Sequence, residues 1–214
     1  MTAPVIRPET EADFRAVEEM TREAFWNVYK PGCDEHYLVH IMRGHRDFIP
    51  ELAFVITRGD EIAANIMYMK AWLDYDDGSS KEILAFGPIS VHPAYQRRGL
   101  GKWLMSHSFA AAAELGYDCV VIFGNPENYV SSGFKSCSRY GVTLGDGLYP
   151  AALLVRELKE GALDGRHCVY RQSDVLELLD PEKAAEFDRQ FPPKEAGWSA
   201  AQEKFYIYSH SVFR

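Results

Sequence analysis

The sequence predicts an α/β fold, with a mixed sheet of about six or seven strands and helices on both faces. Two patterns predict it. Short apolar runs with the alternation of strands recur along the chain, and segments with a helical spacing of apolar residues lie between them. The composition agrees, because 214 residues, 47% of them hydrophobic and 25% charged, are enough for one globular domain with a small appendage.

The N-terminal part supplies one short strand and two helices. The strand is predicted over residues 4–7 and the first helix over residues 11–26. Thr10 and Asp13 have the spacing of a capping pair at the start of that helix. The second helix, over about residues 34–46, has apolar side chains on one face.

Strands dominate the next part of the chain. Residues 52–57 and 62–69 are predicted to form the arms of a long hairpin. Residues 82–91 are nearly all apolar, as expected of a central strand that is covered on both faces. Gly87-Pro88 interrupts this strand, and because proline has no amide proton for the ladder, we expect a bulge or a splay there.

Helices and strands then alternate up to residue 158. A helix is predicted over residues 102–115 and a buried strand over residues 119–123. A short helix over residues 125–132 and strands over residues 134–140 and 151–158 follow.

Charge and cysteine content exclude several classes of protein. Lys and Arg number 23 against 31 Asp and Glu, and the formal net charge of −8 argues against a nucleic-acid-binding protein. The four cysteines, Cys33, Cys119, Cys137 and Cys168, are too scattered for a zinc knuckle or a disulfide framework. No signal-peptide pattern and no apolar run of about 18 residues is present, so we expect a cytoplasmic protein without a membrane segment.

The most informative stretch is Ile89-Ser-Val-His-Pro-Ala-Tyr-Gln-Arg-Arg-Gly-Leu-Gly101. A buried strand ends, a loop with two glycines and two arginines follows, and a helix begins. Unpaired amides in the first turn of that helix, together with its dipole, favour a phosphate or pyrophosphate. Other phosphate loops fit poorly, because Gln96 stands where a Walker loop needs glycine and Leu104 where a dinucleotide fingerprint needs it.

These residues resemble the GNAT superfamily of acyl-CoA-dependent N-acyltransferases. The family signature Q/R-x-x-G-x-G/A after a strand matches Gln96-Arg-Arg-Gly-Leu-Gly101, and a downstream signature matches Asn125, Tyr129 and Gly133-Phe134. Ile6-Arg7-Pro8 and Asp13-Phe14 are similar to the first strand and helix of the family, so the resemblance covers about residues 4–158. It implies the GNAT fold, with a mostly antiparallel sheet.

The resemblance also implies a set of functional residues. Acetyl-CoA is the expected acyl donor, and Tyr129 is expected near its sulfur as the acid that protonates the departing thiolate. The residues expected to bind the donor are Ile89, Ser90, Val91, Gln96, Arg97, Arg98, Gly99, Leu100, Gly101, Lys102 and Asn125. An oxyanion donor is expected among the strand amides near Val91.

The general base has weaker candidates. Glu82 opens the central strand, where some members of the family place a carboxylate, but its position is one residue away from the expected spacing and faces the other side unless the bulge compensates. His36 and His40 share a helix face and are interpreted as solvated surface residues. Cys119 and Cys137 are interpreted as core residues, and no metal site is predicted.

The predicted function is transfer of an acetyl group from acetyl-CoA to a primary amine, by direct attack in a ternary complex. The alternative is a GNAT-fold module that binds acyl-CoA without catalysis, and a further one is transfer to another nucleophile or of a longer acyl chain. The acceptor is expected to be a small-molecule or peptide amine, and the acidic charge slightly favours a polyamine, an aminoglycoside or lysine. No nucleic acid or membrane is an expected partner, and a homodimer stays open.

Residues 159–214 match nothing in the core of the family and form a predicted C-terminal extension of the domain 1–158. One helix, about residues 181–191, is clear in this extension. Aromatic residues crowd its end, more than a free tail would carry, so we expect it to pack on the domain and to wall the acceptor side. They are Trp198, Phe205, Tyr206, Tyr208 and Phe213.

Overall fold

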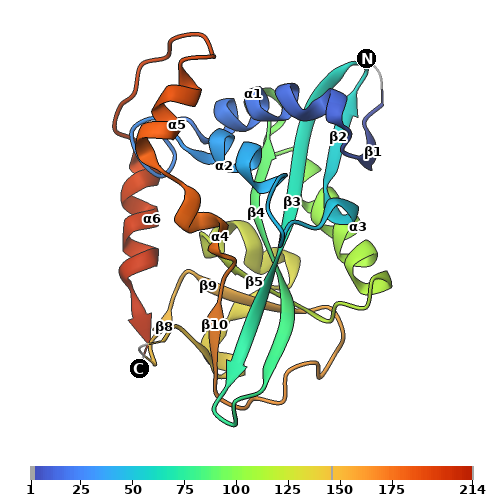
Figure 1. Cartoon of the computed structure of the whole chain (residues 1–214), viewed down its shortest axis with the longest axis vertical. Coiled ribbons are helices and arrows are strands. Elements are labelled where there is room, and N and C mark those ends of the chain that lie inside the picture. Colours follow the sequence, from blue (N-terminus) through green and yellow to red (C-terminus); the bar gives the residue numbers. More distant parts are fainter. Residues whose placement is uncertain (1–2, 146, 214) are drawn as a thin grey trace.

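The main sheet is mixed and mostly antiparallel (Figure 1). The computed structural model describes residues 3–145 and 147–213. The strands of the sheet are β1 (Val5–Pro8), β2 (Phe54–Arg58), β3 (Glu61–Tyr75), β4 (Ser80–Val91), β5 (Cys119–Phe123), β6 (Lys135–Ser136), β7 (Val142–Thr143), β9 (Leu153–Glu157) and β10 (Cys168–Arg171). They follow the order β1-β2-β3-β4-β5-β9-β6, with β10 paired to β3 and β7. β4–β5 and β7–β10 are parallel pairs, and the other pairs are antiparallel.

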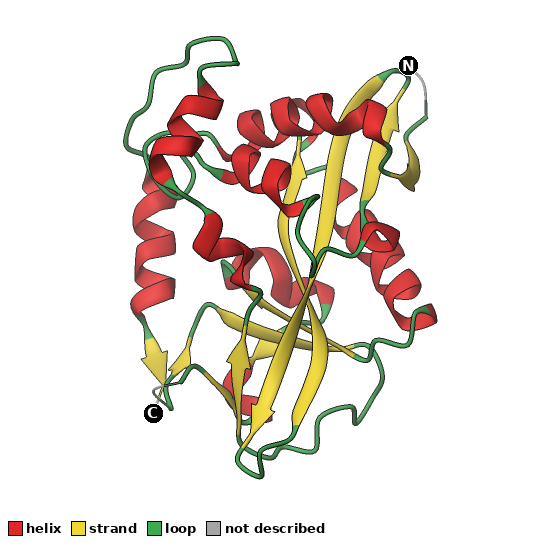
Figure 2. Cartoon of the chain, viewed as in Figure 1, coloured by secondary structure: helices red, strands yellow, loops and turns green. Residues whose placement is uncertain are grey.

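Helices cover both faces of the sheet, as predicted (Figure 2). They are α1 (Phe14–Phe25), α2 (Glu35–Met42), α3 (Leu100–Glu114), α4 (Pro126–Tyr129), α5 (Pro181–Asp188) and α6 (Ala200–His210). Val55 of β2 packs with Val17 of α1, whereas its neighbours Phe54 and Ile56 pack with Leu104 of α3. Successive strand residues face opposite sides, so α1 and α3 lie on opposite faces. No helix in the described part of the chain is long and apolar enough to cross a membrane.

Short 3₁₀ helices and a second small sheet complete the fold. The 3₁₀ segments are η1 (Glu11–Asp13), η2 (Pro50–Leu52), η3 (Pro93–Tyr95), η4 (Val130–Ser132), η5 (Cys137–Tyr140) and η6 (Asp174–Leu178). β8 (Tyr149–Pro150) and β11 (Val212–Phe213) pair antiparallel and tie the C-terminal end to the sheet region.

β4 carries the predicted bulge. Ile66 pairs with Ile89 and Tyr68 with Phe86, so β4 has one more residue than β3 in this interval, at the Gly-Pro pair. On its other side β4 also splays from β5, because the parallel pairing joins Leu84 to Val120 and does not continue toward the end of β4. The second half of β4 therefore has an edge that β5 leaves open.

Two local predictions were wrong. The strand predicted over residues 134–140 is only the two-residue β6, because Ser136 then caps η5 through a hydrogen bond from the Ser138 amide to its hydroxyl (3.4 Å). The helix predicted over about residues 34–46 ends at Met42, and the following loop turns back toward the sheet.

The chain after Leu158 contacts the rest of the fold through β10, α5 and α6. β10 adds to the outer half of β3, α5 packs against α2, and α6 stands beside α5 at the edge of the molecule (Figure 1). Neither β10 nor α6 was predicted from the sequence. β10 is only four residues long, and α6 has no buried residue, so neither produces a clear apolar period.

A buried ion-pair cluster joins α5 to α1 and α2. The Arg22 guanidinium, almost fully buried, donates to both carboxylate oxygens of Asp188 (2.6 and 3.2 Å). His36, which is fully buried, places Nε2 3.0 Å from the same carboxylate. Asp188 of the C-terminal segment thus pairs with the buried Arg22 of α1 and lies beside the buried His36 of α2.

We expect Asp188→Ala to lower the free energy of unfolding by about 3 kcal/mol, because it leaves the buried Arg22 charge without a partner. Urea unfolding at neutral pH measures this. Glu186→Ala, at an exposed position of the same helix, is the matched control and should change the value by less than about 0.5 kcal/mol. Equal effects of the two substitutions would show that the cluster does not hold the segment.

Candidate active site

A groove of about 750 Å³ lies where β4 ends and α3 begins; we call it the α3 groove. Its floor is the open edge of β4, and its walls come from the loop before α3, the first turn of α3, α1 and α4. The lining residues are Ala24, Phe25, Val28, Tyr29, Ile89, Val91, Tyr95, Gln96, Arg97, Gly99, Leu100, Gly101, Lys102, Met105, Asn128, Tyr129 and Ala201.

The first turn of α3 gives this groove features that suit an anion. Gly99 adopts the left-handed conformation at the N-cap (φ 83°), and the first helical hydrogen bond runs from the Trp103 amide to its carbonyl (3.0 Å). The amides of Leu100, Gly101 and Lys102 precede that bond and have no acceptor within the helix. Such amides, at the positive end of the helix dipole, suit phosphate groups.

Basic side chains add to this field. Arg97 and Lys102 line the α3 groove, and Arg98 lies beside the Tyr95 ring, with its guanidinium carbon 5.8 Å from the centroid. In residues 3–145 and 147–213 none of the three cations takes part in an ion pair. Their charge is therefore available to a bound anion, although the protein as a whole is acidic.

Most of the predicted donor-binding residues line the α3 groove. They are Ile89, Val91, Gln96, Arg97, Gly99, Leu100, Gly101 and Lys102. Ser90 does not, because its side chain points to the opposite face of β4 and bonds to Thr21 of α1 (3.2 Å). Arg98 lies just outside the lining.

Asn125 also lies outside the groove. Its side chain caps α4 by accepting a hydrogen bond from the Glu127 amide (2.9 Å), so its oxygen is already used. Asn128, one turn later, lines the groove instead. The contact of Asn125 with the donor therefore stays a prediction, and Asn128 is the asparagine that lines the groove.

A second, smaller cavity of about 210 Å³ lies on the other side of the splayed strand; we call it the apolar cavity. It reaches from the bulge of β4 to α2 and to the segment after β10. The lining residues are Phe25, Tyr29, Glu35, Leu38, Met42, Met69, Ala85, Phe86, Gly87, Pro88, Ile89, Ile122, Phe123, Tyr129, Tyr170, Gln172, Ser173, Val175 and Leu176.

Tyr129 lines both the α3 groove and the apolar cavity. Its ring packs against Phe86 and Phe134, with centroids 5.9 and 5.8 Å away. Burial raises its pKa well above the ordinary value, so the phenol stays protonated at neutral pH. Gly124 makes room for the ring, because a Cβ there would lie 2.6 Å from Tyr129 Cε2.

Glu35, at the start of α2, is the only charged residue among the described residues that line the apolar cavity. Burial raises the pKa of its carboxyl to about 7, although the Asp34 amide donates a hydrogen bond to it (3.1 Å). Burial, with the charge of Glu35 as a second cause, raises the pKa of Tyr29 to about 12. A carboxyl that titrates near neutrality can hold or release a proton under working conditions.

Glu35 was not among the candidates for the general base that the sequence suggested. Glu82 lines neither cavity: its carboxylate binds Lys70 (3.2 Å) and the Tyr117 hydroxyl (3.0 Å) at the exposed end of β4. Gly87 lies five positions further along the strand, which is roughly 16 Å. The bulge therefore does not bring Glu82 to the site.

The two histidines of α2 have different environments, and neither lines a cavity. The interpretation of His36 as a solvated residue was wrong, since it is fully buried beside Asp188 and burial lowers its pKa to about 4. His40 is exposed and places Nδ1 2.9 Å from Glu18. Glu35, Leu38 and Met42 lie on the face of α2 that lines the apolar cavity, whereas His36 and His40 lie on another face.

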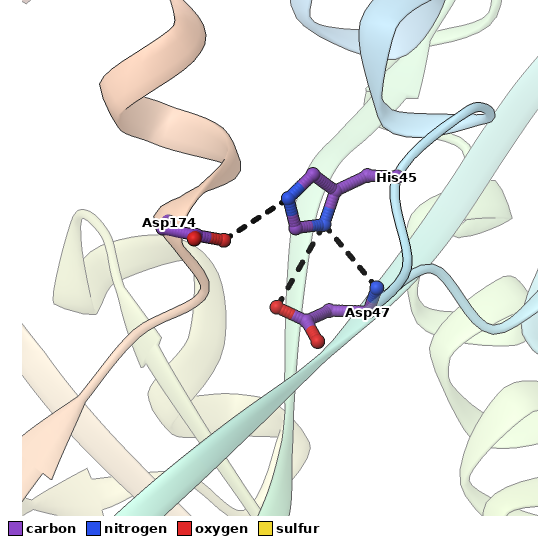
Figure 3. Close-up of side chains that lie close together, drawn as sticks. All are labelled: His45, Asp47 and Asp174. Carbon is purple, nitrogen blue, oxygen red and sulfur yellow. Dashed lines mark hydrogen bonds and ion pairs between the residues drawn. The ribbon is translucent and has the colours of Figure 1, made fainter.

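One wall of the apolar cavity is held by the cluster in Figure 3. His45 Nδ1 accepts from the Asp47 amide (3.2 Å), and its Nε2 lies 3.0 Å from Asp174. Asp47 accepts from the Ser173 hydroxyl (2.8 Å), and Arg46 donates to Asp174 (2.5 Å). Both carboxylates thus have partners in the protein, and these contacts fasten the segment that contains Ser173 to the loop after α2.

The comparisons with known proteins agree with this geometry. A sequence model described as "Acetyltransferase (GNAT) family" matches residues 16–134. The uncharacterized N-acetyltransferase YhbS of Escherichia coli K12 is 26% identical over 162 residues, which cover 75% of this chain and 91% of that protein.

Two solved structures share the fold. A YhbS structure from Escherichia coli in complex with CoA has a TM-score of 0.70 at 22% identity, covering 83% of this chain and 93% of that one. A GNAT family acetyltransferase from Brucella melitensis in complex with acetyl-CoA has a TM-score of 0.65 at 19% identity, covering 82% and 99%.

We expect Glu35→Gln to change the pH dependence of stability. The folded-state pKa of about 7 exceeds the ordinary 4.5, so the contribution of this carboxyl to stability is complete below pH 4.5 and is lost as the pH rises through 7. As the pH rises between these two values, the unfolding free energy of the variant should therefore increase relative to that of the wild type, by up to about 3 kcal/mol. Urea unfolding of both proteins at pH 4.5 and 7.5 measures this change. If the difference between their unfolding free energies were the same at both pH values, the raised pKa of Glu35 would be contradicted.

Proposed function

The chain belongs to the acetyltransferase (GNAT) family, and on that premise we propose that it transfers an acetyl group from acetyl-CoA to a primary amine while both substrates are bound. The observation that carries the proposal is the meeting of two cavities at Tyr129. The α3 groove offers phosphate-binding amides, and the apolar cavity offers a carboxyl. A reaction between two bound substrates needs such a junction.

The α3 groove suits the donor. The free amides of Leu100 to Lys102 and the charge of Arg97 match a pyrophosphate. The open edge of β4, from Phe86 to Val91, offers backbone donors and acceptors to the extended arm of CoA, as a sheet edge does to an added strand. This arrangement leads the thioester end toward Tyr129.

The acceptor must lose a proton before it attacks. An alkylammonium has a pKa of about 10.4, and a carboxylate of ordinary pKa is a poor proton acceptor for it. The pKa of Glu35, near 7, is closer to that of the ammonium than the ordinary carboxyl value of 4.5 is, by about 2.5 units. This difference makes the proton transfer to Glu35 more favourable by about 3 kcal/mol. We assign Glu35 as the group that receives this proton.

The bond changes then balance. The amine nitrogen bonds to the carbonyl carbon of the thioester, and a β4 amide stabilises the oxyanion. The carbon–sulfur bond breaks, and the thiolate takes a proton from the Tyr129 phenol. The nitrogen loses its first proton to Glu35 before it attacks and its second proton to water as the amide forms, and solvent restores Glu35 and Tyr129 after the products leave.

Direct transfer is favoured over an acyl-cysteine intermediate. The four cysteines Cys33, Cys119, Cys137 and Cys168 are all buried, and none lines either cavity. Burial raises the pKa of Cys33 to about 12 and that of Cys137 to about 11, so their thiols stay protonated and weakly nucleophilic.

We expect Gly101→Asp to weaken CoA binding at least about tenfold, because its carboxylate would stand against the phosphates. The protein itself accommodates a side chain there, since a Cβ would meet only Val91 Cγ2, at 3.6 Å. Isothermal titration calorimetry measures the affinity. Gly145→Asp is the control for charge, because a Cβ at Gly145 meets no atom within 4 Å. Unchanged binding in Gly101→Asp would refute the donor site.

We expect Tyr129→Phe to lower kcat at least about tenfold with little change in CoA affinity, because only the proton donor is removed. In the described part of the chain the Tyr129 hydroxyl has no hydrogen-bond partner, so the substitution leaves no protein group unpaired. Free-thiol release with the best amine of a panel measures kcat. A variant with the wild-type kcat would assign Tyr129 a packing role, as in a module that binds acyl-CoA without catalysis.

A further inference from the structure

We propose that the apolar cavity is the acceptor site and that it takes a small primary amine with a hydrophobic body and a single positive charge. This inference rests on the proposed acetyl transfer. It replaces the polyamine, aminoglycoside or lysine acceptor that the net charge of the chain favoured, because the lining of one cavity, rather than the total charge, decides what it binds.

Size and lining argue for this class. The cavity volume of about 210 Å³ lies below the roughly 300–1,000 Å³ of sites that hold drug-sized ligands, so it suits a small amine better than an aminoglycoside. Its lining is mainly apolar, with Leu38, Met42, Met69, Phe86 and Ile122 among the side chains. Such a mainly apolar wall favours a hydrocarbon or aromatic body over one that carries many hydroxyl groups.

Charge argues for one ammonium group. Glu35 is the only charged side chain in the described lining, and it forms no ion pair within residues 3–145 and 147–213. Its carboxylate therefore has lone pairs free for a ligand ammonium. A second ammonium, as in a polyamine, would find no second carboxylate among the described lining residues.

The C-terminal segment completes the site. Tyr170 of β10, with Val175 and Leu176 of η6, closes the side of the cavity opposite β4 and lies outside the residues that match the family model. The cluster of Asp47 and Asp174 (Figure 3) holds this segment in place. Acceptor choice is therefore a property of this chain and not of the shared donor site.

The first test compares acceptors with the full-length protein and acetyl-CoA. Thiol release is measured with phenethylamine, hexylamine, spermidine, kanamycin and a lysine-containing tetrapeptide. We expect kcat/KM for the two hydrophobic amines to exceed that for each of the others at least tenfold. A higher value for spermidine, kanamycin or the peptide overturns the inference and leaves the proposed acetyl transfer intact.

The second test adds a charge to the wall. Leu176 is 39% exposed, so Leu176→Glu can fold, and its carboxylate should raise the KM for phenethylamine at least tenfold and lower that for 1,4-diaminobutane. Leu178→Glu, on the same η6 but outside both cavities, is the matched control and should leave both values unchanged. Equal effects of the two variants overturn the inference.

Calorimetric titration of phenethylamine into the CoA-bound protein separates the inference from the proposed function. Phenethylamine binding that is weakened by Leu176→Glu but not by Leu178→Glu supports the cavity as an amine site. If no amine also gives thiol release, the proposed acetyl transfer is overturned. No binding of the hydrophobic amines, with thiol release from another acceptor, overturns the inference alone.

Discussion

The separation of β4 from β5 is the constraint on which the site depends. The two parallel strands pair at Leu84 and Val120, and the bulge at Gly87-Pro88 turns the rest of β4 away. A sheet edge that would be covered in a regular sheet is thereby left open, with backbone groups free to bind an extended ligand. The α3 groove lies on one side of this opening and the apolar cavity on the other.

Side chains far apart in the sequence keep this opening structured. The Arg22–Asp188 pair ties α5 to α1, and His45 ties η6 to the loop after α2. α6 adds a cover at the junction, where Phe205 packs on Tyr29 with ring centroids 4.4 Å apart. The C-terminal segment is therefore part of the site, although it contributes little to the central core.

The two titratable groups of the site share one physical cause. Burial raises the pKa of Tyr129, which keeps a proton available, and it raises the pKa of Glu35 to about 7, which makes that carboxylate a better proton acceptor. The low-dielectric cavity thus prepares an acid and a base at the same time. In the acceptor site that we propose, the apolar lining has a second consequence, because it also favours a hydrophobic body of the acceptor.

The sequence alone determined the α/β class, the bulge in β4 and the phosphate-binding turn of α3, because each of these depends on local order: alternation, a proline in a strand, and glycines before a helix. It could not reveal Glu35 or the C-terminal wall, since nothing near Glu35 in the sequence shows that Leu176 and Tyr129 line the same cavity. It also assigned Asn125 and Glu82 to the site, whereas the tertiary structure places the Asn125 side chain at the cap of α4 and Glu82 at the exposed end of β4, outside both cavities. Local signals follow from neighbours along the chain, whereas burial, and the pKa shifts that it causes, follow from neighbours in space.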